Sequence, residues 1–539
     1  MSKKIKSSAQ QPIAVVGVSA LYPGSSAVDG FWKNIINAED QIREVPPTHW
    51  LIEDYYDPDP TAPDKTYCKT GAFLDPVPFN PMEFGMPPNA MPSTDTAQLL
   101  ALIVAKKVLD DASNGQFKDL NKDNISVILG VASGTELLSN LVSRLQRPVW
   151  VKALRETGLP ESQVQEACNR ISDSYVPWQE SSFPGLLGNV VAGRIANRFD
   201  LGGTNCVTDA ACASSLSAMS MGISELYLGQ SDMVITGGAD ALNEILMYMC
   251  FSKTPAFSPT GDCRPFSDKG DGTIIGEGIG MMALRRLEDA ERDGNKIYAV
   301  ISGYGTSSDG SGTSVYAPKP EGQAKALRRA YNEAGYSPST VELLEAHGTG
   351  TKAGDKAEFN GVNSVFSESS PDTKQWCAIG SVKSQIGHTK ASAGIAGMIK
   401  AVLSLNNKIL PPTLKVDKPN PALNIEESAF YINTKTRPWI RASDHPRRAS
   451  VSSFGFGGSN FHMALEEYKG DSKLATRFRA LSSEMLLMSA DNSGHLLSDI
   501  KKLQEELKTE SNLITLAHQS QQDFNEKQAV RLAIIATND

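Results

Sequence analysis

The chain has 539 residues, of which 40% are hydrophobic and 21% charged, and its formal net charge is −9. This balance is typical of a globular protein with a large core, and the acidic charge excludes the basic footprint of a nucleic-acid-binding protein. The seven cysteines are widely spaced and include no CxxC pair, which excludes a disulfide framework and makes a structural zinc site unexpected.

Residues 1–11 are polar and basic, and we expect a disordered leader there. No run of 18 apolar residues follows, so the sequence predicts a cytoplasmic protein that does not enter a membrane.

Short apolar runs predict strands along the chain, at 13–17, 125–130, 232–239, 280–287, 296–303, 341–348, 376–382 and 449–458. Helical patterns occupy 215–229 and 325–335, and the stretch 140–185 predicts helices that decorate the sheet. Strands that alternate with helices indicate βαβ units and an α/β fold.

The pattern changes after Tyr468. A polar segment leads to an apolar run at 486–490, a charged helical pattern at 498–511 and a strand-like ending at 530–539. We interpret residues 469–539 as a linker that begins a further unit.

Cys212 lies in DAACASSLSAM (209–219), between a strand-like run and a helical pattern. A thiolate at a helix start faces free N–H groups and the positive end of the helix dipole, which predicts a lowered pKa. Small neighbours leave room for a thioester. A buried cysteine that only packs at the helix start is the alternative, and this motif alone does not decide between them.

His347 lies in EAHGTGTKAGDKAE (345–358), where an apolar strand ends, which is where α/β folds place functional groups. Thr349 and Thr351 offer hydroxyl groups for a polar substrate arm, and Asp355 and Glu358 share one helix face. A capped turn with a structural histidine explains this segment equally well.

Two further motifs combine glycines with candidate functional groups. Lys383 and His388 flank a glycine in GSVKSQIGHTKASAG (380–394), again after an apolar run. A lysine near a histidine is usually incidental, but one held by a buried carboxylate such as Glu358 would tune the protonation of its neighbours. In SSFGFGGSNFH (452–462), we expect Phe454 in the core, whereas the surrounding glycines make Phe456 a candidate gate.

The sequence resembles the β-ketoacyl synthase family of the thiolase superfamily. The resemblance lies in the order of its motifs: a cysteine, two histidines after strands and a late glycine loop. The resemblance covers about residues 12–468 and includes PIAVVG (12–17), RPFSDKGDG (264–272) and GEGIGMMALRRLEDAERDG (276–294). THWLIEDYYD (48–57) and FSKTPAF (251–257) are most similar to ketosynthases that open the first subunit of bacterial polyunsaturated fatty acid synthases. STDTAQ (93–98) departs from the DPQQR-like segment of many modular polyketide synthases.

The resemblance implies a thiolase-like fold, in which two βαβαβαββ halves form a five-layered α/β/α/β/α sandwich. The halves would span about 12–290 and 291–468, and the tail at 469–539 resembles a truncated linker towards an acyltransferase domain. It also implies a homodimer, with its interface near 205–211, and an acyl carrier protein as partner. Residues 140–185 and Met247 are candidates for shaping an acyl tunnel.

The implied reaction is a decarboxylative Claisen condensation of a cysteine-bound acyl group with malonyl-acyl carrier protein. Cys212 matches the nucleophile, His347 and His388 match the groups that stabilise the enolate, and the N–H groups of Cys212 and Phe456 match the oxyanion hole. Lys383 and Glu358 match a supporting ion pair, with Asp355 behind it, and Thr349 and Thr351 match residues that bind phosphopantetheine. The resemblance implies no metal and no cofactor bound by this domain.

Other functions share parts of this pattern. A loading-type decarboxylase would carry glutamine at Cys212, and a thiolase would carry a second cysteine where this chain has GFGGSN (455–460). A non-condensing partner like a chain-length factor would lack the nucleophile, whereas Cys212, His347 and His388 are all present.

Overall fold

The computed structural model describes residues 11–132, 135–241, 243–312, 314–440, 444–472, 475, 483–509 and 513–537. The predicted leader therefore lies, apart from Gln11, outside the described residues. No described helix is both long and apolar enough to cross a bilayer.

The first half of the chain builds a mixed sheet in the order β1-β7-β6-β4-β5. Its strands are β1 (Ile13–Leu21), β4 (Ile125–Val131), β5 (Asn205–Thr208), β6 (Met233–Asp240) and β7 (Gly278–Arg286). β4 pairs in parallel with β5 and β6, whereas β7 runs antiparallel to β6 and β1. Nearly all strand residues apart from those of β5 are buried, as expected where helices cover both faces.

The second half repeats this pattern in the order β10-β9-β14-β15-β8, with β12 added at the edge. Its strands are β8 (Ala299–Ser308), β9 (Leu343–Glu345), β10 (Cys377–Gly380), β12 (Phe430–Ile432), β14 (Arg448–Gly455) and β15 (Ser459–Glu466). β9 pairs in parallel with β10 and β14, and β15 runs antiparallel to β14 and β8. β1 also pairs with β8, so the two halves share one eleven-stranded ladder. The predicted duplication of the fold is confirmed.

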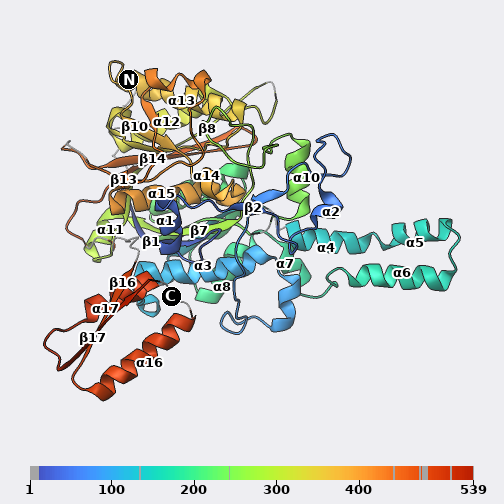
Figure 1. Cartoon of the computed structure of the whole chain (residues 1–539), viewed down its shortest axis with the longest axis horizontal. Helices are drawn as coiled ribbons and strands as arrows, with labels where there is room; N and C mark the ends of the chain where they lie inside the picture. Colours follow the sequence, from blue (N-terminus) through green and yellow to red (C-terminus); the bar gives the residue numbers. More distant parts are fainter. Residues whose placement is uncertain are drawn as a thin grey trace, which may run out of the picture.

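Helices make the other three layers (Figure 1). They are α3 (Thr96–Ser113) and α8 (Val190–Phe199) on one outer side, α12 (Pro320–Ala334) and α13 (Lys352–Ser369) on the other, and α9 (Ser214–Tyr227) and α15 (Ala393–Asn407) between the sheets. Every residue of α15 is buried, because this helix meets protein on all sides. The five-layered α/β/α/β/α sandwich is the predicted fold.

Shorter elements connect these layers. They are α1 (Val28–Ile36), α2 (Ile52–Tyr55), α10 (Ile245–Lys253), α11 (Leu287–Arg292), α14 (Lys383–Ile386), β2 (Ile42–Glu44), β3 (Thr70–Ala72), β11 (Ile409–Leu410) and β13 (Arg437–Pro438). The chain also enters α9 and α15 through 3₁₀ turns, Ala211–Ala213 and Lys390–Ser392 respectively.

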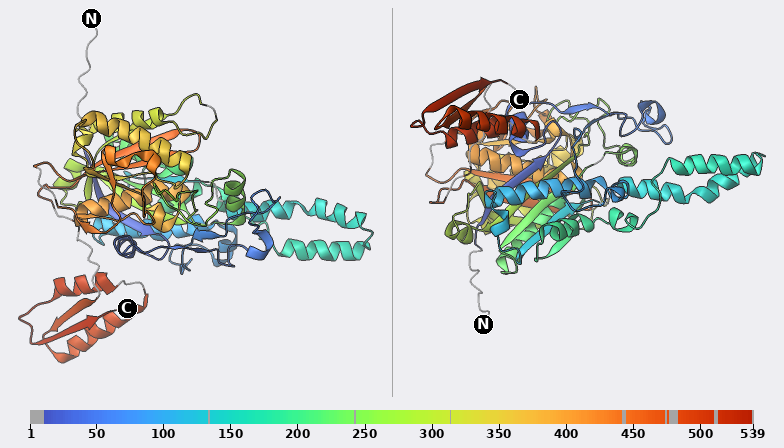
Figure 2. Two further views of the ribbon diagram at one scale, coloured as in Figure 1. Left: turned by 45° about the horizontal axis from the view of Figure 1, so that its top comes forward. Right: turned by 90° about the horizontal axis from the view of Figure 1, so that it is seen from below.

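The predicted helices at 140–185 are present, but they do not all lie on the sheet. They are α4 (Thr135–Leu145), α5 (Arg147–Glu156), α6 (Glu161–Asp173) and α7 (Ser182–Leu186). Figures 1 and 2 show α5 and α6 as a pair that projects from the body of the molecule. No residue of α5 is buried, because the contacts of this helix are mainly with α6. The expectation that the whole stretch decorates the sheet was therefore wrong for α5 and α6.

The C-terminal residues form a small unit of their own. β16 (Glu484–Ala490) and β17 (Val530–Ala536) pair antiparallel, and α16 (Ser493–Thr509) and α17 (Leu513–Asp523) pack against them. Leu486, Leu513 and Ala517 make its core, and Figure 2 shows it beside the main body. The helix and the C-terminal strand predicted in this tail are present, as α16 and β17.

Candidate functional site

Cys212, His347 and His388 converge from three different segments of the chain. Cys212 lies in the turn before α9, His347 follows β9, and His388 follows α14. The cysteine sulfur and one nitrogen of each imidazole all lie within 4.8 Å of one another. The two imidazole centroids are 5.4 Å apart, with their planes at 83°. The fold therefore brings Cys212 and His388, which are 176 positions apart in the sequence, into one site.

Cys212 is held where β5 turns into α9. The preceding residue, Ala211, has a φ of 51°, and the Cys212 carbonyl accepts a hydrogen bond of 2.7 Å from the Ser453 hydroxyl. In the second half, Lys390 occupies the corresponding turn before α15 with a φ of 47°. Non-glycine residues adopt this left-handed conformation rarely, so the duplicated fold repeats a constrained turn at both helix starts.

Burial raises the pKa of the Cys212 thiol to about 11. Four groups lower the pKa of this thiol, but they do not outweigh burial. They are Lys383, the N–H groups of Cys212 and Phe456, and Lys390. The expectation of a lowered pKa was therefore wrong. The N–H of Cys212, at the helix start, does lower the pKa as predicted, yet loss of hydration has the larger effect.

The protonation of His388 is fixed by the main chain. Its Nδ1 accepts a 3.0 Å hydrogen bond from the Lys390 N–H, so a neutral imidazole carries its proton on Nε2. Burial, followed by the positive charge of Lys383, holds the pKa of His388 well below its ordinary value. His388 is thus a neutral ring with an N–H donor, and its Nε2 has no hydrogen-bond partner among the described residues.

His347 is positioned through its backbone. Its N–H donates to Glu358 Oε1 at 2.7 Å, and its carbonyl accepts from Lys383 Nζ at 2.5 Å. Burial, followed by Lys383, holds the pKa of His347 well below its ordinary value. The site therefore contains two neutral imidazoles that can donate hydrogen bonds.

Lys383 and Glu358 do not form the direct ion pair that the sequence predicted. Both are buried, and no ion pair of 4 Å or less joins them among the described residues; the hydrogen bond of the lysine Nζ goes to the His347 carbonyl instead. Instead, Lys383 holds the His347 carbonyl, while the two oxygens of Glu358 accept the N–H groups of His347 and Gly348, each at 2.7 Å. Burial raises the pKa of Glu358 to about 7 and lowers that of Lys383. The two groups support the same residue without touching each other.

Asp355 braces the loop that follows His347. Its buried carboxylate accepts hydrogen bonds from the N–H groups of Phe266 at 2.7 Å and Gly350 at 3.0 Å, and burial raises its pKa to about 6. Thr349 and Thr351 lie in this loop, partly exposed, with their hydroxyl oxygens 2.9 Å apart. The loop therefore presents two hydroxyl groups beside the His347 segment.

The two phenylalanines of the glycine loop have opposite environments. Phe454 is 7% exposed, whereas Phe456 is 55% exposed and faces the ring of Tyr316. The main-chain N–H of Phe456 lowers the pKa of the Cys212 thiol, against the larger effect of burial. The exposure of Phe456 agrees with its prediction as a gate, and Phe454 belongs to the core, as predicted.

Sequence reasoning missed Lys390 and its partner Asp240. The two are buried and form an ion pair of 2.8 Å. Lys390 stands only two residues after His388, but nothing in the sequence pairs it with Asp240, which ends a strand 150 residues earlier.

Met247, which we proposed to shape a tunnel, lies on α10. It packs against a separate cluster that includes Tyr248 and Phe257.

The donor set Cys212, His347 and His388 also resembles a metal site in its composition. A metal ligand needs a free lone pair on the imidazole nitrogen that faces the ion. In His388, Nδ1 already accepts the Lys390 N–H, and Nε2 carries the proton. The geometry thus favours hydrogen-bond donation by His388 over metal ligation.

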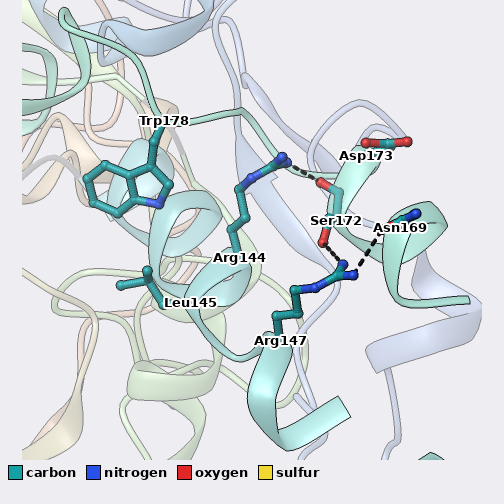
Figure 3. Close-up of a pocket in the computed structure, with 7 residues that line it drawn as sticks. All are labelled: Arg144, Leu145, Arg147, Asn169, Ser172, Asp173 and Trp178. Carbon is teal, nitrogen blue, oxygen red and sulfur yellow. Dashed lines mark hydrogen bonds between the residues drawn. The ribbon is translucent and has the colours of Figure 1, made fainter. Parts of the chain in front are cut away.

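A separate hollow of about 470 Å³ lies between α4, α5 and α6 (Figure 3). Arg144 donates to the carbonyls of Ser172 and Tyr175, and Arg147 donates to the side chains of Ser172 and Asn169. Arg144 thereby binds carbonyls at and just beyond the C-terminal end of α6, where a cation is favoured. None of Cys212, His347 and His388 lines this hollow.

Comparisons with known proteins agree with this geometry. Family models match the β-ketoacyl synthase N-terminal domain at residues 10–290, its C-terminal domain at 298–417 and the ketoacyl-synthetase C-terminal extension at 419–535. A polyunsaturated fatty acid synthase subunit from Thraustochytrium sp. is 42% identical over 497 residues, which cover 91% of this chain. Polyketide synthase PksL of Bacillus subtilis is 34% identical over 488 residues, or 90% of this chain. The matched regions span only 18% and 10% of these longer relatives.

Solved structures show the same fold. The ketosynthase from module 6 of the bacillaene synthase of Bacillus subtilis 168, in a cysteine-to-serine mutant form, has a TM-score of 0.74 and 32% identity, with 98% of this chain and 83% of that chain covered. The oxazolomycin ketosynthase domain OzmH KS7 of Streptomyces albus JA3453 has a TM-score of 0.76 and 29% identity, with 98% and 86% covered. From its sequence, its duplicated fold and these relatives, the chain belongs to the β-ketoacyl synthase family and is a ketosynthase of the polyketide and polyunsaturated fatty acid synthase type.

Proposed function

We propose that this chain catalyses the decarboxylative condensation of an acyl group bound to Cys212 with malonyl-acyl carrier protein. The observation that carries the proposal is the convergence of one thiol and two neutral imidazoles within 4.8 Å. A thiol can form a reactive thioester, and two N–H donors can stabilise an enolate.

The first step transfers the acyl group. The Cys212 sulfur attacks the thioester carbonyl of the acyl carrier, the N–H groups of Cys212 and Phe456 bind the oxyanion, and the carrier thiolate leaves with the proton that Cys212 loses. Because the Cys212 pKa is about 11, the thiol is protonated at neutral pH until the substrate arrives. The exposed Phe456 ring would act as the gate for this approach.

The second step makes the carbon–carbon bond. Malonyl-carrier loses CO₂, and the electrons of the broken bond form an enolate whose oxygen accepts hydrogen bonds from His347 and His388. The enolate carbon attacks the Cys212 thioester, and the Cys212 thiolate leaves and takes up a proton from water, so each condensation consumes one proton. A single donor of this kind is worth about 3 kcal/mol in the transition state.

Supporting residues act through His347 and the carrier arm. Lys383 and Glu358 hold the His347 backbone from opposite sides, and Asp355 braces the loop after it. Thr349 and Thr351 would bind the phosphopantetheine arm of the carrier with their hydroxyl groups. The domain would bind no cofactor of its own.

The family resemblance also suggests the assembly. We propose a cytoplasmic homodimer whose interface includes β5, because β5 is one of the two edge strands of the eleven-stranded sheet and is partly exposed. Residues 469–539 would lead to an acyltransferase domain, with 12–290 and 291–468 as the two ketosynthase halves. The similarity to longer multidomain relatives supports this arrangement.

Mass spectrometry tests the proposal in two arms. Incubation with an acyl-carrier thioester should add one acyl group to Cys212, and Cys212→Ser should abolish the thioester. Cys212→Gln should still release CO₂ from malonyl-carrier, because both histidines remain. Failure of Cys212 to become acylated would favour the non-condensing partner, and a silent Cys212→Gln variant would contradict the roles of the histidines.

A further inference from the structure

Lys390 makes an unusual turn directly after His388. Its φ of 47° lies in the left-handed region, although lysine has no special preference for it. This conformation turns the Lys390 N–H back towards His388 Nδ1, at 3.0 Å. The tautomer of His388 therefore depends on the backbone geometry of a single residue.

The Lys390 side chain is tied to the first half of the protein. Its Nζ contacts Asp240 Oδ1 at 2.8 Å and donates to Asn243 Oδ1 at 2.6 Å and to the Gly276 carbonyl at 3.0 Å. Asp240 uses its other oxygen to accept the Ala391 N–H at 3.3 Å. The side chains of Lys390 and Asp240 are each only 9% exposed. One buried carboxylate thus holds both the side chain of the left-handed residue and the backbone of the next one.

The partners of Lys390 are themselves anchored. Glu277 Oε1 accepts the Asn243 N–H at 2.7 Å and lies 2.8 Å from His49 Nε2. The neighbouring Gly276 N–H donates to the His388 carbonyl at 2.9 Å. The segment that binds the lysine ammonium therefore also binds the main chain of His388.

We propose that Lys390 is a positioning residue for the reaction, which keeps His388 as the Nε2–H tautomer by means of a left-handed turn clamped to Asp240, Asn243 and Gly276. The proposal rests on the proposed function, in which the Nε2–H of His388 donates to the enolate. In the other tautomer, Nε2 would offer a lone pair to the enolate oxygen and repel it.

Electrostatics act in the same direction. Lys390 is one of the positive charges that lower the pKa of His388, after burial and Lys383. A neutral His388 is the form whose tautomer the turn selects. The side chain and the backbone of Lys390 thus favour the same state of the ring.

The test compares two matched double variants in the Cys212→Gln background, where CO₂ release is measured without condensation. Lys390→Met with Asp240→Asn removes the clamp and leaves no unpaired buried charge. Lys400→Met with Glu345→Gln removes another buried pair, whose Lys400 Nζ lies 2.8 Å from Glu345 Oε2. In the second pair, the lysine makes no hydrogen bond to either histidine of the site among the described contacts.

Two readouts follow His388 directly. The ¹⁵N spectrum of histidine-labelled protein, with His388 assigned from a His388→Gln spectrum, reports which ring nitrogen carries the proton. Steady-state kinetics of CO₂ release from malonyl-carrier separate kcat from KM. We expect the Lys390/Asp240 variant to lose the pure Nε2–H signal and at least about tenfold in kcat, with KM changed less than about threefold. The Lys400/Glu345 variant should keep the tautomer.

The outcomes separate this proposal from the proposed function. An unchanged tautomer and unchanged kcat in the Lys390/Asp240 variant would overturn the positioning role, while CO₂ release by Cys212→Gln itself would still support the histidines. Absence of CO₂ release from Cys212→Gln with Lys390 intact would overturn the proposed function. In that case the tautomer in the ¹⁵N spectrum still decides whether Lys390 positions His388.

Discussion

Two effects of opposite sign act on the pKa of the Cys212 thiol. The N–H groups of Cys212 and Phe456, with Lys383 and Lys390, favour the thiolate, whereas burial favours the thiol and prevails. The same burial keeps His347 and His388 neutral, so one environment suits the nucleophile for a thioester and the imidazoles for hydrogen-bond donation. A sequence shows that a cysteine stands at a helix start, but the degree of burial depends on residues from both halves.

Alkylation should reveal the raised pKa of Cys212. The thiolate is the reactive form, so its rate with iodoacetamide should increase about tenfold per pH unit up to pH about 11, the folded-state pKa. Peptide mass spectrometry after short labelling measures this rate, with the exposed Cys250 as internal reference. A rate at Cys212 that levels off below pH 8 would show that the thiolate is favoured in the resting enzyme.

Glu358→Gln should disturb His347 without touching the reaction centre. Both carboxylate oxygens accept main-chain N–H groups, and an amide would replace one acceptor with a donor. We expect a loss of about 1–3 kcal/mol in the free energy of unfolding and a fall in CO₂ release by the Cys212→Gln enzyme of about tenfold. Chemical denaturation and CO₂ assays check this. Full decarboxylation in the variant would show that His347 does not need this support.

Among the elements, β14 and the glycine loop show how closely buried and exposed positions can alternate. Phe454 points into the core at the end of β14, and Phe456, two residues later, lies at the surface beyond the strand. The strand and the glycine loop were predictable from a short apolar run and from glycine spacing. The clamp of Lys390 was not, because Asp240 and Asn243 reach it only through the packing of the two halves.

A matched pair of substitutions separates these two positions. Phe454→Ala should lower the free energy of unfolding by about 3–5 kcal/mol, because it leaves a cavity in the core. Phe456→Ala should cost less than about 1 kcal/mol, because the ring is already 55% exposed. Denaturant unfolding of both variants decides this. Equal losses of stability would contradict the assignment of Phe456 as a surface gate.

For the whole molecule, duplication explains why the site lies where it does. The central helices α9 and α15 begin at equivalent turns, and these turns bring Cys212 and His388 together between the sheets. The order of strands and helices predicted an α/β fold, because buried strands and amphipathic helices have distinct periods. The duplicated, five-layered arrangement was predicted from the family resemblance. The projection of α5 and α6 was not predictable, since a helical period does not show what a helix packs against.

The projecting pair should be dispensable for folding of the main body. Replacing residues 148–171 with a short Gly/Ser connector removes most of α5 and α6, and α5 buries no residue. We expect the shortened protein to lose little thermal stability and to retain acylation of Cys212, measured by calorimetry and intact-protein mass spectrometry. Loss of folding would show that the pair stabilises the body through α4 and α7.

The most direct test of the proposed condensation is the stoichiometry of a single turnover. The enzyme is loaded with hexanoyl at Cys212, freed of excess donor and mixed with malonyl-carrier that carries ¹³C in its free carboxyl group. We expect 3-oxooctanoyl-carrier to form, with one labelled CO₂ released per product and free Cys212 regenerated. Labelled CO₂ with no new carbon–carbon bond, while hexanoyl remains on Cys212, would contradict the proposed condensation.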